Sequence, residues 1–343
     1  MDGQHEARYW SKSSNSEEIV CELCPHACRL APGELGLCGV RRHQDGKLWS
    51  LNYGRAIAAH VDPIEKKPFF HVLPGSRSMS VATVGCNLRC SHCQNHDISQ
   101  YPRTNPGPLP GTYMSAEAVV EEAKRTRSAT LAFTYTEPTI FLEWAQDIAS
   151  AAAEQDDLRC VAVSNGFVEA RPIRDFEGRL LAVNVDLKSF RDEFYRHNCG
   201  ARLQPVKDSI VHMRDLGIWV EVTTLLIPEL NDSTEELKAM AAFLASVDPA
   251  MPWHLSRFHP DYKLQNLGPT PEASIRRARD IGLDAGLRFV YSGNVWGDVG
   301  ESTRCPACDA MIIERHGFTV RENRLGQDGL CPDCGEKIEG VWV

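Results

Sequence analysis

The sequence predicts an α/β protein whose centre, residues 79–297, is a partial (β/α)6 barrel, with a cysteine-containing lobe before it (1–78) and a cysteine ribbon after it (298–343). Two observations predict the barrel. Short apolar, β-branched runs alternate with helical patterns, as in parallel βαβ units. Several of these runs are apolar for most of their length, as buried parallel strands are. The flanking parts are predicted from the cysteines, because eleven of the 13 fall into three groups.

Composition limits the classes of function. The 343 residues carry a net charge of −9, which argues against a general nucleic-acid binder. No apolar run approaches the roughly 18 residues that span a bilayer. The first ten residues, "MDGQHEARYW", are charged and lack the apolar core of a signal peptide. We therefore expect a cytoplasmic protein, in which 13 cysteines indicate metal sites or thiol chemistry more than disulfides.

The elements of the expected barrel follow one another in order. Seven runs are predicted strands: 78–84, 130–136, 159–166, 181–189, 219–228, 253–258 and 289–295. Five patterns between them are predicted helices: 115–126, 140–154, 204–217, 233–247 and 271–286. Ser115 and Ser233 stand where helix N-caps belong. Polar residues end each strand, and active sites of such barrels lie at the carboxyl ends of the strands.

Three cysteines, Cys86, Cys90 and Cys93, follow the first strand in "VGCNLRCSHCQNH" without a fourth nearby. Structural zinc sites close on four ligands, and iron–sulfur clusters are normally held by four thiolates. A group of three could hold three irons of a 4Fe–4S cube and leave the fourth iron open. The alternative is a zinc site completed by Cys160 or Cys199. Otherwise we expect Cys160 to be a buried apolar residue, and Cys199 to be inert packing more than a reactive thiol.

Two further groups each contain four cysteines. Cys305, Cys308, Cys331 and Cys334 form two C-x2-C pairs around a probable hairpin, which predicts a zinc ribbon that staples the tail. The spacing of Cys21, Cys24, Cys28 and Cys38 fits either zinc or a second 4Fe–4S cluster. Zinc is favoured there because the spacing differs from that of ferredoxins.

The ordered motifs resemble a known superfamily. C-x3-C-x2-C after the first strand of a βα-repeat chain is the signature of radical SAM enzymes. "IEKKPFFH", "YTEP", "SNG", "VDLK" and "FHP" resemble, in order, the pyruvate formate-lyase activating enzyme branch. "CELCPHACRL", "NVWGDVGEST" and the cysteine pairs that follow it resemble the AmmeMemoRadiSam system radical SAM enzymes. The resemblance covers about residues 18–343.

This resemblance implies a cofactor set and a site. The trio would bind a 4Fe–4S cluster whose open iron chelates S-adenosylmethionine (SAM). The residues implied to contact SAM are Glu137 at the methionine amino group, Asp186 and His259 at the ribose, Lys188 at the carboxylate, and Asn165 and Asn294, which help to seat it. The activating enzymes have glycines where this chain has Tyr135 and Thr136.

Simpler roles exist for several of these residues. Asp186 and Lys188 lie two apart on one strand, so they face the same way and could be an internal ion pair. Glu137 could be a helix-start acid, and His259 an ordinary core histidine.

The function expected from the resemblance is reductive cleavage of SAM to a 5′-deoxyadenosyl radical, which abstracts hydrogen from a substrate that the sequence does not identify. The expected partners are a reductant such as flavodoxin or ferredoxin, together with Memo-like and AMMECR1-like proteins. One alternative is an activase that makes a glycyl radical in a partner protein. Others are a non-catalytic zinc-binding scaffold and, against the acidic charge, a zinc-ribbon nucleic-acid binder.

Overall fold

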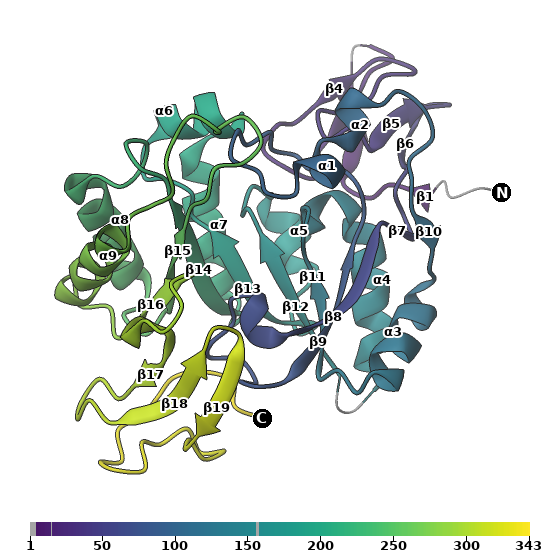
Figure 1. Cartoon of the computed structure of the whole chain (residues 1–343). Coiled ribbons are helices and arrows are strands. Elements are labelled where there is room, and N and C mark those ends of the chain that lie inside the picture. The colour runs from purple at the N-terminus through teal and green to yellow at the C-terminus, as the bar shows by residue number, and fades with distance from the viewer. Residues whose placement is uncertain (1–4, 15, 156–157) are drawn as a thin grey trace.

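The computed structural model describes residues 5–14, 16–155 and 158–343, and an eight-stranded sheet forms its centre (Figure 1). From one edge to the other the strand order is β8-β9-β11-β12-β13-β14-β15-β16. Seven strands are parallel and in chain order, and only β8 is antiparallel. The strands are β8 (Ala58–Pro63), β9 (Arg77–Ala82), β11 (Thr130–Phe133), β12 (Arg159–Ser164), β13 (Leu180–Asp186), β14 (Trp219–Leu226), β15 (Trp253–Arg257) and β16 (Val290–Gly293). All seven predicted strands are present.

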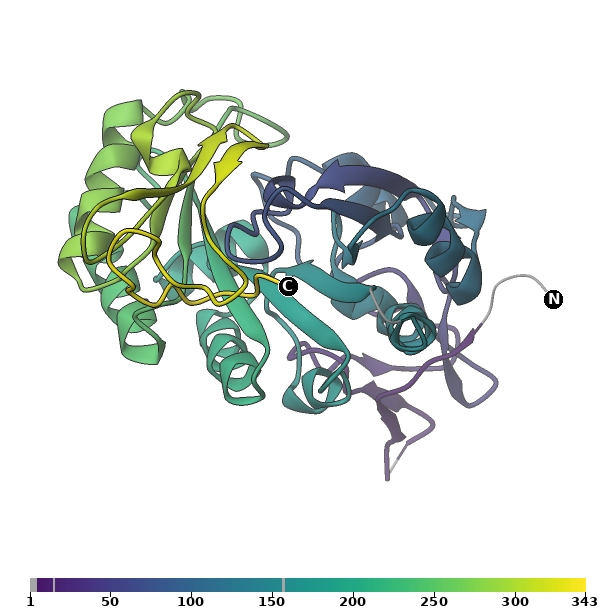
Figure 2. The same ribbon diagram turned by 90° about the horizontal axis from the view of Figure 1, so that it is seen from below.

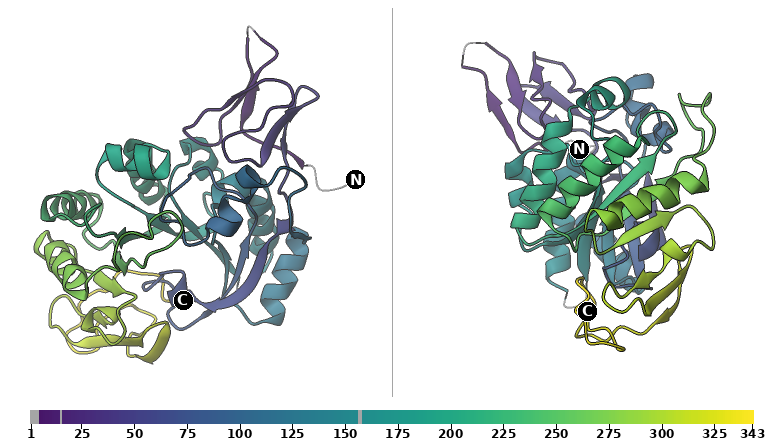
Figure 3. Two further views of the ribbon diagram at one scale, coloured as in Figure 1. Left: turned by 45° about the horizontal axis from the view of Figure 1, so that its top comes forward. Right: turned by 90° about the vertical axis from the view of Figure 1, so that its left-hand side faces the viewer.

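Each connection between successive parallel strands contains a helix that lies on the outside of the curved sheet (Figure 3). These helices are α3 (Ala116–Arg125), α4 (Leu142–Ala153), α5 (Ala170–Arg174), α7 (Leu203–Asp215), α8 (Thr234–Val247) and α9 (Glu272–Asp284). The five predicted helices are confirmed, and Ser115 and Ser233 accept the expected N-cap hydrogen bonds. Only α5, which has five residues and a proline, left no periodic signal. Among the described helices, none has the length and apolarity to cross a bilayer.

Residues 58–73, grouped above with the N-terminal lobe, are built into the core. Strand β8 pairs with β9 from Ala58 opposite Ala82 to Pro63 opposite Arg77. The segment after it begins with the short helix η1 (Ile64–Lys66) and fills the inside of the sheet. There Phe69 and Val72, both fully buried, pack on alanine and valine side chains of β11, β12 and β13. The core sheet therefore begins about twenty residues before the expected boundary at 78.

The N-terminal lobe consists of short strands, although the sequence suggested little regular structure there. Two antiparallel sheets have the orders β1-β6-β5 and β2-β3-β4. Strands of two to four residues are too short to show an alternating pattern. The bounds are β1 (His5–Glu6), β2 (Trp10–Lys12), β3 (Ile19–Cys21), β4 (Arg29–Leu30), β5 (Arg41–Gln44) and β6 (Lys47–Ser50), and β7 (Arg55–Ala56) pairs with β10 (Thr112–Tyr113).

The C-terminal segment lies on the other side of the core from this lobe (Figure 1). After the short helix η4 (Val299–Glu301) it forms an antiparallel sheet of β17 (Thr303–Arg304), β18 (Met311–His316) and β19 (Thr319–Asn323). The end of the chain then returns to the middle of the molecule, where Val341 bridges Val72 (Figure 2). The remaining short helices are α1 (His96–Ser99), α2 (Tyr101–Thr104), η2 (Pro138–Phe141), α6 (Asp192–Phe194) and η3 (Tyr195–Cys199).

A buried polar network joins the inner segment to the sheet and to the C-terminal segment. Glu221 on β14 accepts hydrogen bonds from the amides of Phe70 and His71, at 3.0 and 2.9 Å, and lies 2.6 Å from His254. Arg315 on β18 donates to the Phe70 carbonyl at 2.7 Å. His71 Nδ1 lies 2.6 Å from the Glu339 carbonyl, and its Nε2 lies 2.6 Å from the Tyr291 hydroxyl. These contacts fit a neutral imidazole that donates from Nδ1 and accepts at Nε2.

Stability should therefore depend on pH through His71. Burial lowers the pKa of this imidazole to about 4, below the ordinary value of about 6.5. Between these values the unfolded chain binds a proton that the folded chain excludes, so the free energy of unfolding decreases as the pH falls from 6.5 toward 4. The decrease due to His71 between pH 7 and 5.5 should be about 1 kcal/mol. Urea unfolding at both pH values should show a smaller decrease for His71→Gln than for wild type, and equal decreases would contradict the assignment.

Candidate functional site

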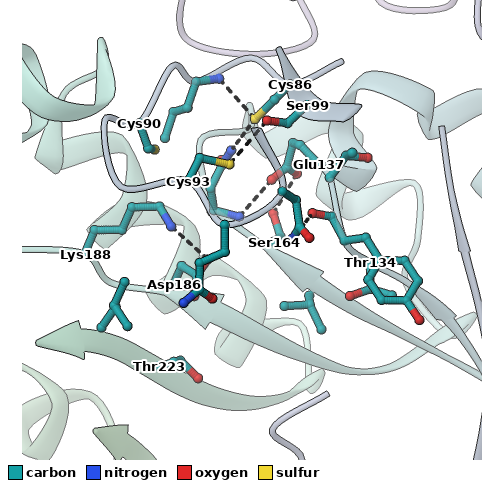
Figure 4. A pocket seen from close by; sticks show the side chains of 18 of the residues that line it. Cys86, Cys90, Cys93, Ser99, Thr134, Glu137, Ser164, Asp186, Lys188 and Thr223 are labelled. Carbon is teal, nitrogen blue, oxygen red and sulfur yellow. Dashed lines mark hydrogen bonds and ion pairs between the residues drawn. The ribbon is translucent and has the colours of Figure 1, made fainter. Parts of the chain in front are cut away.

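A cavity of about 510 Å³ opens at the carboxyl ends of the parallel strands (Figure 4). The three central cysteines lie along it, next to the ends of β11, β12 and β13. Seven of the residues expected at the site line it: Cys86, Cys90, Cys93, Glu137, Asn165, Asp186 and Lys188. The cavity therefore lies where the βα-barrel rule leads us to expect a site.

The loop that carries the trio is braced by neighbouring polar groups. The amide of Leu88 lies 3.3 Å from Cys86 Sγ, and the hydroxyl of Ser99 lies 3.2 Å from Cys93 Sγ. Asn165, at the end of β12, donates to the side-chain oxygen of Asn87 at 2.8 Å. Amide and hydroxyl donors beside the sulfurs suit thiolates that ligate a metal cluster.

Two further residues of the kinds that can ligate a metal lie beside Cys90. Its sulfur, the Cys199 sulfur and a ring nitrogen of His92 all lie within 4.8 Å of one another, and all three residues are buried. A hydrogen bond with Cys199, together with burial, raises the pKa of the Cys90 thiol. Cys199 is fully buried, as packing predicts, and it lies beside the trio, as the alternative of a fourth ligand requires. Cys160 is buried near the amino end of β12, away from the cavity.

Glu137 ties the end of β11 to the end of β12. Its carboxylate accepts hydrogen bonds from the amide and hydroxyl of Thr139, at 3.0 and 2.7 Å. It also accepts from the Ser164 hydroxyl and the Asn165 amide, each at 2.8 Å. Burial raises the pKa of this carboxyl, which is 1% exposed. Glu137 is thus the N-cap of η2, as its simpler role suggests, and it also lies on the cavity wall.

Asp186 and Lys188 form an ion pair on the same wall. Lys188 Nζ lies 2.8 Å from Asp186 Oδ2, so the internal ion pair is present. Burial alone would lower the pKa of Lys188, but Asp186, Cys90 and Cys199 raise it above its ordinary value. The ammonium group is therefore held in its charged form beside the cysteines, where it can pair with an anionic group of a ligand.

Two predicted site residues do not join this set. His259 follows β15 and is exposed, so it is not a core histidine, and it is not part of the cavity wall within the described residues. Asn294 follows β16, donates to the Ser256 hydroxyl at 2.9 Å and also lies outside the described cavity lining.

A polar cluster that was not expected from the sequence lies at the edge of the cavity. Lys67 lies 2.6 Å from Asp62, and its ammonium group lies 4.2 Å from the centre of the Tyr135 ring. The Tyr135 hydroxyl donates to the same Asp62 carboxylate. Tyr135 has a φ of 63°, a conformation that favours glycine, at a position where the resemblance implies glycine. The "IEKKPFFH" and "YTEP" motifs were the available signals, but neither predicts that their side chains meet.

The eight terminal cysteines form two separate groups. Four sulfurs at the C-terminus lie within 4.8 Å of one another, with Cys305 at 3.6 Å from Cys334 and Cys308 at 3.8 Å from Cys331. Four sulfurs at 2.3 Å from one tetrahedral ion would lie about 3.8 Å apart. This group therefore has the size of a mononuclear metal site. In the N-terminal group of Cys21, Cys24, Cys28 and Cys38, no three sulfurs lie within 4.8 Å of one another.

Comparisons with known proteins agree with this geometry. The family model described as the radical SAM superfamily matches residues 80–244. An uncharacterized protein of Methanocaldococcus jannaschii, MJ0808, is 39% identical over 338 residues, which are 98% of this chain and 99% of that protein. The pyruvate formate-lyase-activating enzyme of Clostridium pasteurianum is 22% identical over 57% of this chain and 84% of its own length.

The fold has a counterpart among solved structures. A radical SAM methyltransferase from Sphaerobacter thermophilus aligns with 90% of this chain and 81% of its own, at 14% identity and a TM-score of 0.50. At that identity the likeness concerns the fold alone. The superfamily implies a 4Fe–4S cluster and SAM, and three cavity-lining thiols beside a carboxylate and a paired ammonium group fit both. The chain belongs to the radical SAM superfamily.

Proposed function

We propose that this protein is an enzyme that cleaves SAM reductively and uses the resulting radical to abstract hydrogen from a substrate. One observation carries the proposal: three cysteines with the superfamily spacing share a cavity with Glu137, Asp186 and Lys188. When bound to the trio, a 4Fe–4S cluster would supply the electron that splits the sulfonium into methionine and a 5′-deoxyadenosyl radical.

The chain's own residues bind and orient the cofactor in this proposal. Lys188 attracts the SAM carboxylate, and Asp186 can accept hydrogen bonds from the ribose hydroxyls. Glu137 holds the ends of two strands in register and presents an acidic group to the amino end of SAM. Asn165 keeps the cysteine loop in place. His259 and Asn294 remain proposed contacts that need the loops after β15 and β16 to approach SAM.

The test is the formation of 5′-deoxyadenosine by protein that has been reconstituted anaerobically with iron and sulfide. We expect deoxyadenosine with SAM and dithionite together and none when either is omitted. Iron and zinc should be counted in the same samples. A folded protein that holds zinc at the trio and yields no deoxyadenosine would instead support the non-catalytic zinc scaffold.

Lys188→Ala should weaken SAM binding more than it lowers protein stability. A charge-assisted contact contributes about 1.5–3 kcal/mol, so the Kd for SAM should rise roughly 10- to 100-fold. Equilibrium binding to the reconstituted protein measures this. Arg196→Ala is the matched control, because it removes an exposed cation from the ion pair with Asp192. A Kd that is the same in all three proteins would contradict the placement of Lys188.

We further propose zinc for the C-terminal group, with the ribbon as a structural staple. Cys305→Ser with Cys308→Ser should lose about one zinc per chain and lower the Tm by several degrees, because metal binding stabilises small domains. Metal analysis and calorimetry measure both effects, with Cys160→Ala as the control. Retention of all the zinc would contradict this assignment.

The substrate and the partners remain proposals. A low-potential donor such as flavodoxin or ferredoxin would supply the electron in the cytoplasm. Memo-like and AMMECR1-like proteins are the proposed pathway partners, from the resemblance of the terminal motifs. Likeness to a pyruvate formate-lyase-activating enzyme favours one alternative, an activase. An activase should generate a protein-centred radical, visible by electron paramagnetic resonance, when it is mixed with its partner, whereas an enzyme for small molecules should turn over without one.

A further inference from the structure

We propose that the N-terminal group of Cys21, Cys24, Cys28 and Cys38 holds a second 4Fe–4S cluster, and that this cluster passes electrons to the central site. The binding of this second cluster does not depend on the proposed reaction with SAM, whereas its relay role does. It reverses the expectation of zinc, which rested on the cysteine spacing in the sequence. The distances between the four sulfur atoms favour a cluster over a single zinc ion.

The sulfur–sulfur distances in the C-terminal cysteine group provide a comparison for those in the N-terminal group. At the C-terminal group all four sulfurs lie within 4.8 Å of one another, as a single tetrahedral ion requires. Residues 21–38 are all described, yet no three of their four sulfurs meet this limit. Among the described residues, the three sulfurs of this chain's own trio, which has the superfamily spacing, do not all lie within 4.8 Å of one another either. A cube of four irons and four sulfides holds its ligands further apart than one ion does, and the N-terminal group resembles the trio in this respect.

The four cysteines are nevertheless neighbours in space. A Cβ added to Gly36 would lie 3.7 Å from the Cys38 sulfur and 3.8 Å from the Cys28 sulfur. Cys24 lies near enough to Cys21, Cys28 and Cys38 to interact electrostatically with all three. The group is therefore gathered in one place, but it is too open for one ion.

The surroundings suit an anionic cluster. Backbone amides donate to the sulfurs of this group, among them those of His26 to Cys24 and Val40 to Cys38. Arg41 is 1% exposed, and its guanidinium interacts electrostatically with Cys21 and Cys38. Its Nε has no hydrogen-bond partner among the described residues. A buried donor without a partner is costly, and a sulfide or thiolate of a cluster would satisfy it.

The position of this group explains what a redox cluster could do there. His26, two residues after Cys24, lies 2.8 Å from the carbonyl of Asn87 in the trio's loop. Arg103 donates to the carbonyls of both Leu37 and Cys86, at 2.7 and 2.8 Å. The two cysteine loops are therefore joined directly. A ferredoxin- or flavodoxin-type donor would lose one electron to the N-terminal cluster, which would pass it to the central cluster, whereas zinc cannot change its oxidation state.

The decisive experiment removes the trio and keeps the N-terminal cysteines. We expect full-length protein with Cys86→Ala, Cys90→Ala and Cys93→Ala, reconstituted anaerobically, to retain about four irons and four sulfides per chain, compared with about eight of each in wild type. After reduction it should show the paramagnetic signal of a 4Fe–4S cluster, although it cannot cleave SAM. A trio variant that contains no iron but two zinc ions would overturn the proposal.

A complementary variant separates this proposal from the function of the trio. Cys24→Ser with Cys28→Ser should lose the second cluster and keep about four irons. With dithionite, which can reduce the central cluster directly, it should still form deoxyadenosine. With reduced flavodoxin as the only donor, the rate should fall at least tenfold. An undiminished flavodoxin-driven rate would refute the relay, and if this variant fails to fold, the iron count of the trio variant still decides whether the cluster exists.

Discussion

Cys90→Ala is expected to reduce deoxyadenosine formation to the background measured without reductant. The trio has no spare ligand in the superfamily spacing, so losing one thiolate leaves two, too few to retain the cluster with one open iron. The measurement is deoxyadenosine per hour after reconstitution, together with iron per chain. Iron should fall by about four per chain.

Cys199→Ala provides the matched control for this result. Cys199 and Cys90 are both buried, and their sulfurs lie within 4.8 Å of each other. If the trio is the ligand set, Cys199→Ala should retain both the iron and the activity. Loss of the cluster in Cys199→Ala, with retention in Cys93→Ala, would show that Cys90, Cys199 and His92 form the actual metal site.

Glu143→Ala should lower the free energy of unfolding by about 3–5 kcal/mol, the cost of leaving a buried charge without its partner. Glu143 on α4 accepts two bonds from Arg41, at 2.6 and 2.7 Å, and both side chains are at most 1% exposed. Its carboxylate also accepts from the amide of Arg8 at 2.8 Å. The loss should therefore loosen the attachment of the N-terminal lobe to the core. Chemical denaturation measures it.

Two variants show whether the effect comes from the unpaired charge. Arg41→Met with Glu143→Leu removes both charges and should recover a large part of the loss. Glu121→Ala breaks an exposed pair with Lys124 on the neighbouring helix α3 and should change stability by less than 1 kcal/mol. Equal losses in Glu143→Ala and the double variant would instead assign the effect to packing.

The strands and helices of the central α/β sheet could be predicted from the sequence because their pattern repeats. Each strand from 78 to 295 shows a compact apolar run, and the N-cap residues Ser115 and Ser233 mark the starts of α3 and α8. Strand β8 was missed as part of the sheet because "AAHVDP" mixes small, polar and apolar residues on an edge strand. Edge strands do not need the continuous apolar character of buried ones.

The sequence predicted which residues would line the cavity better than it predicted which side chains would touch one another. Residues that end parallel strands, such as Glu137 and Asp186, meet because the topology brings them to one edge. Contacts across distant segments leave no such trace. Cys90 meets Cys199 from a short helical turn after β13, and Tyr135 meets Asp62 from another strand. The distances between the sulfurs of a four-cysteine site likewise depend on the folded structure. The sequence spacing of Cys21, Cys24, Cys28 and Cys38 therefore allowed either zinc or a cluster.

The segment from 64 to 73 has two faces, and this limits how the enzyme can be shortened. Lys67 lies on the cavity wall, while Phe70 and His71 a few residues later are held by Arg315 and Glu339. The segment that lines the cavity thus also packs against the C-terminal segment. A chain that ended at residue 297 would lack Arg315 and Glu339, and with them these two contacts to the segment that lines the cavity. Residues 298–343 therefore support the cavity wall, and transferring the central sheet to another protein will require these residues as well.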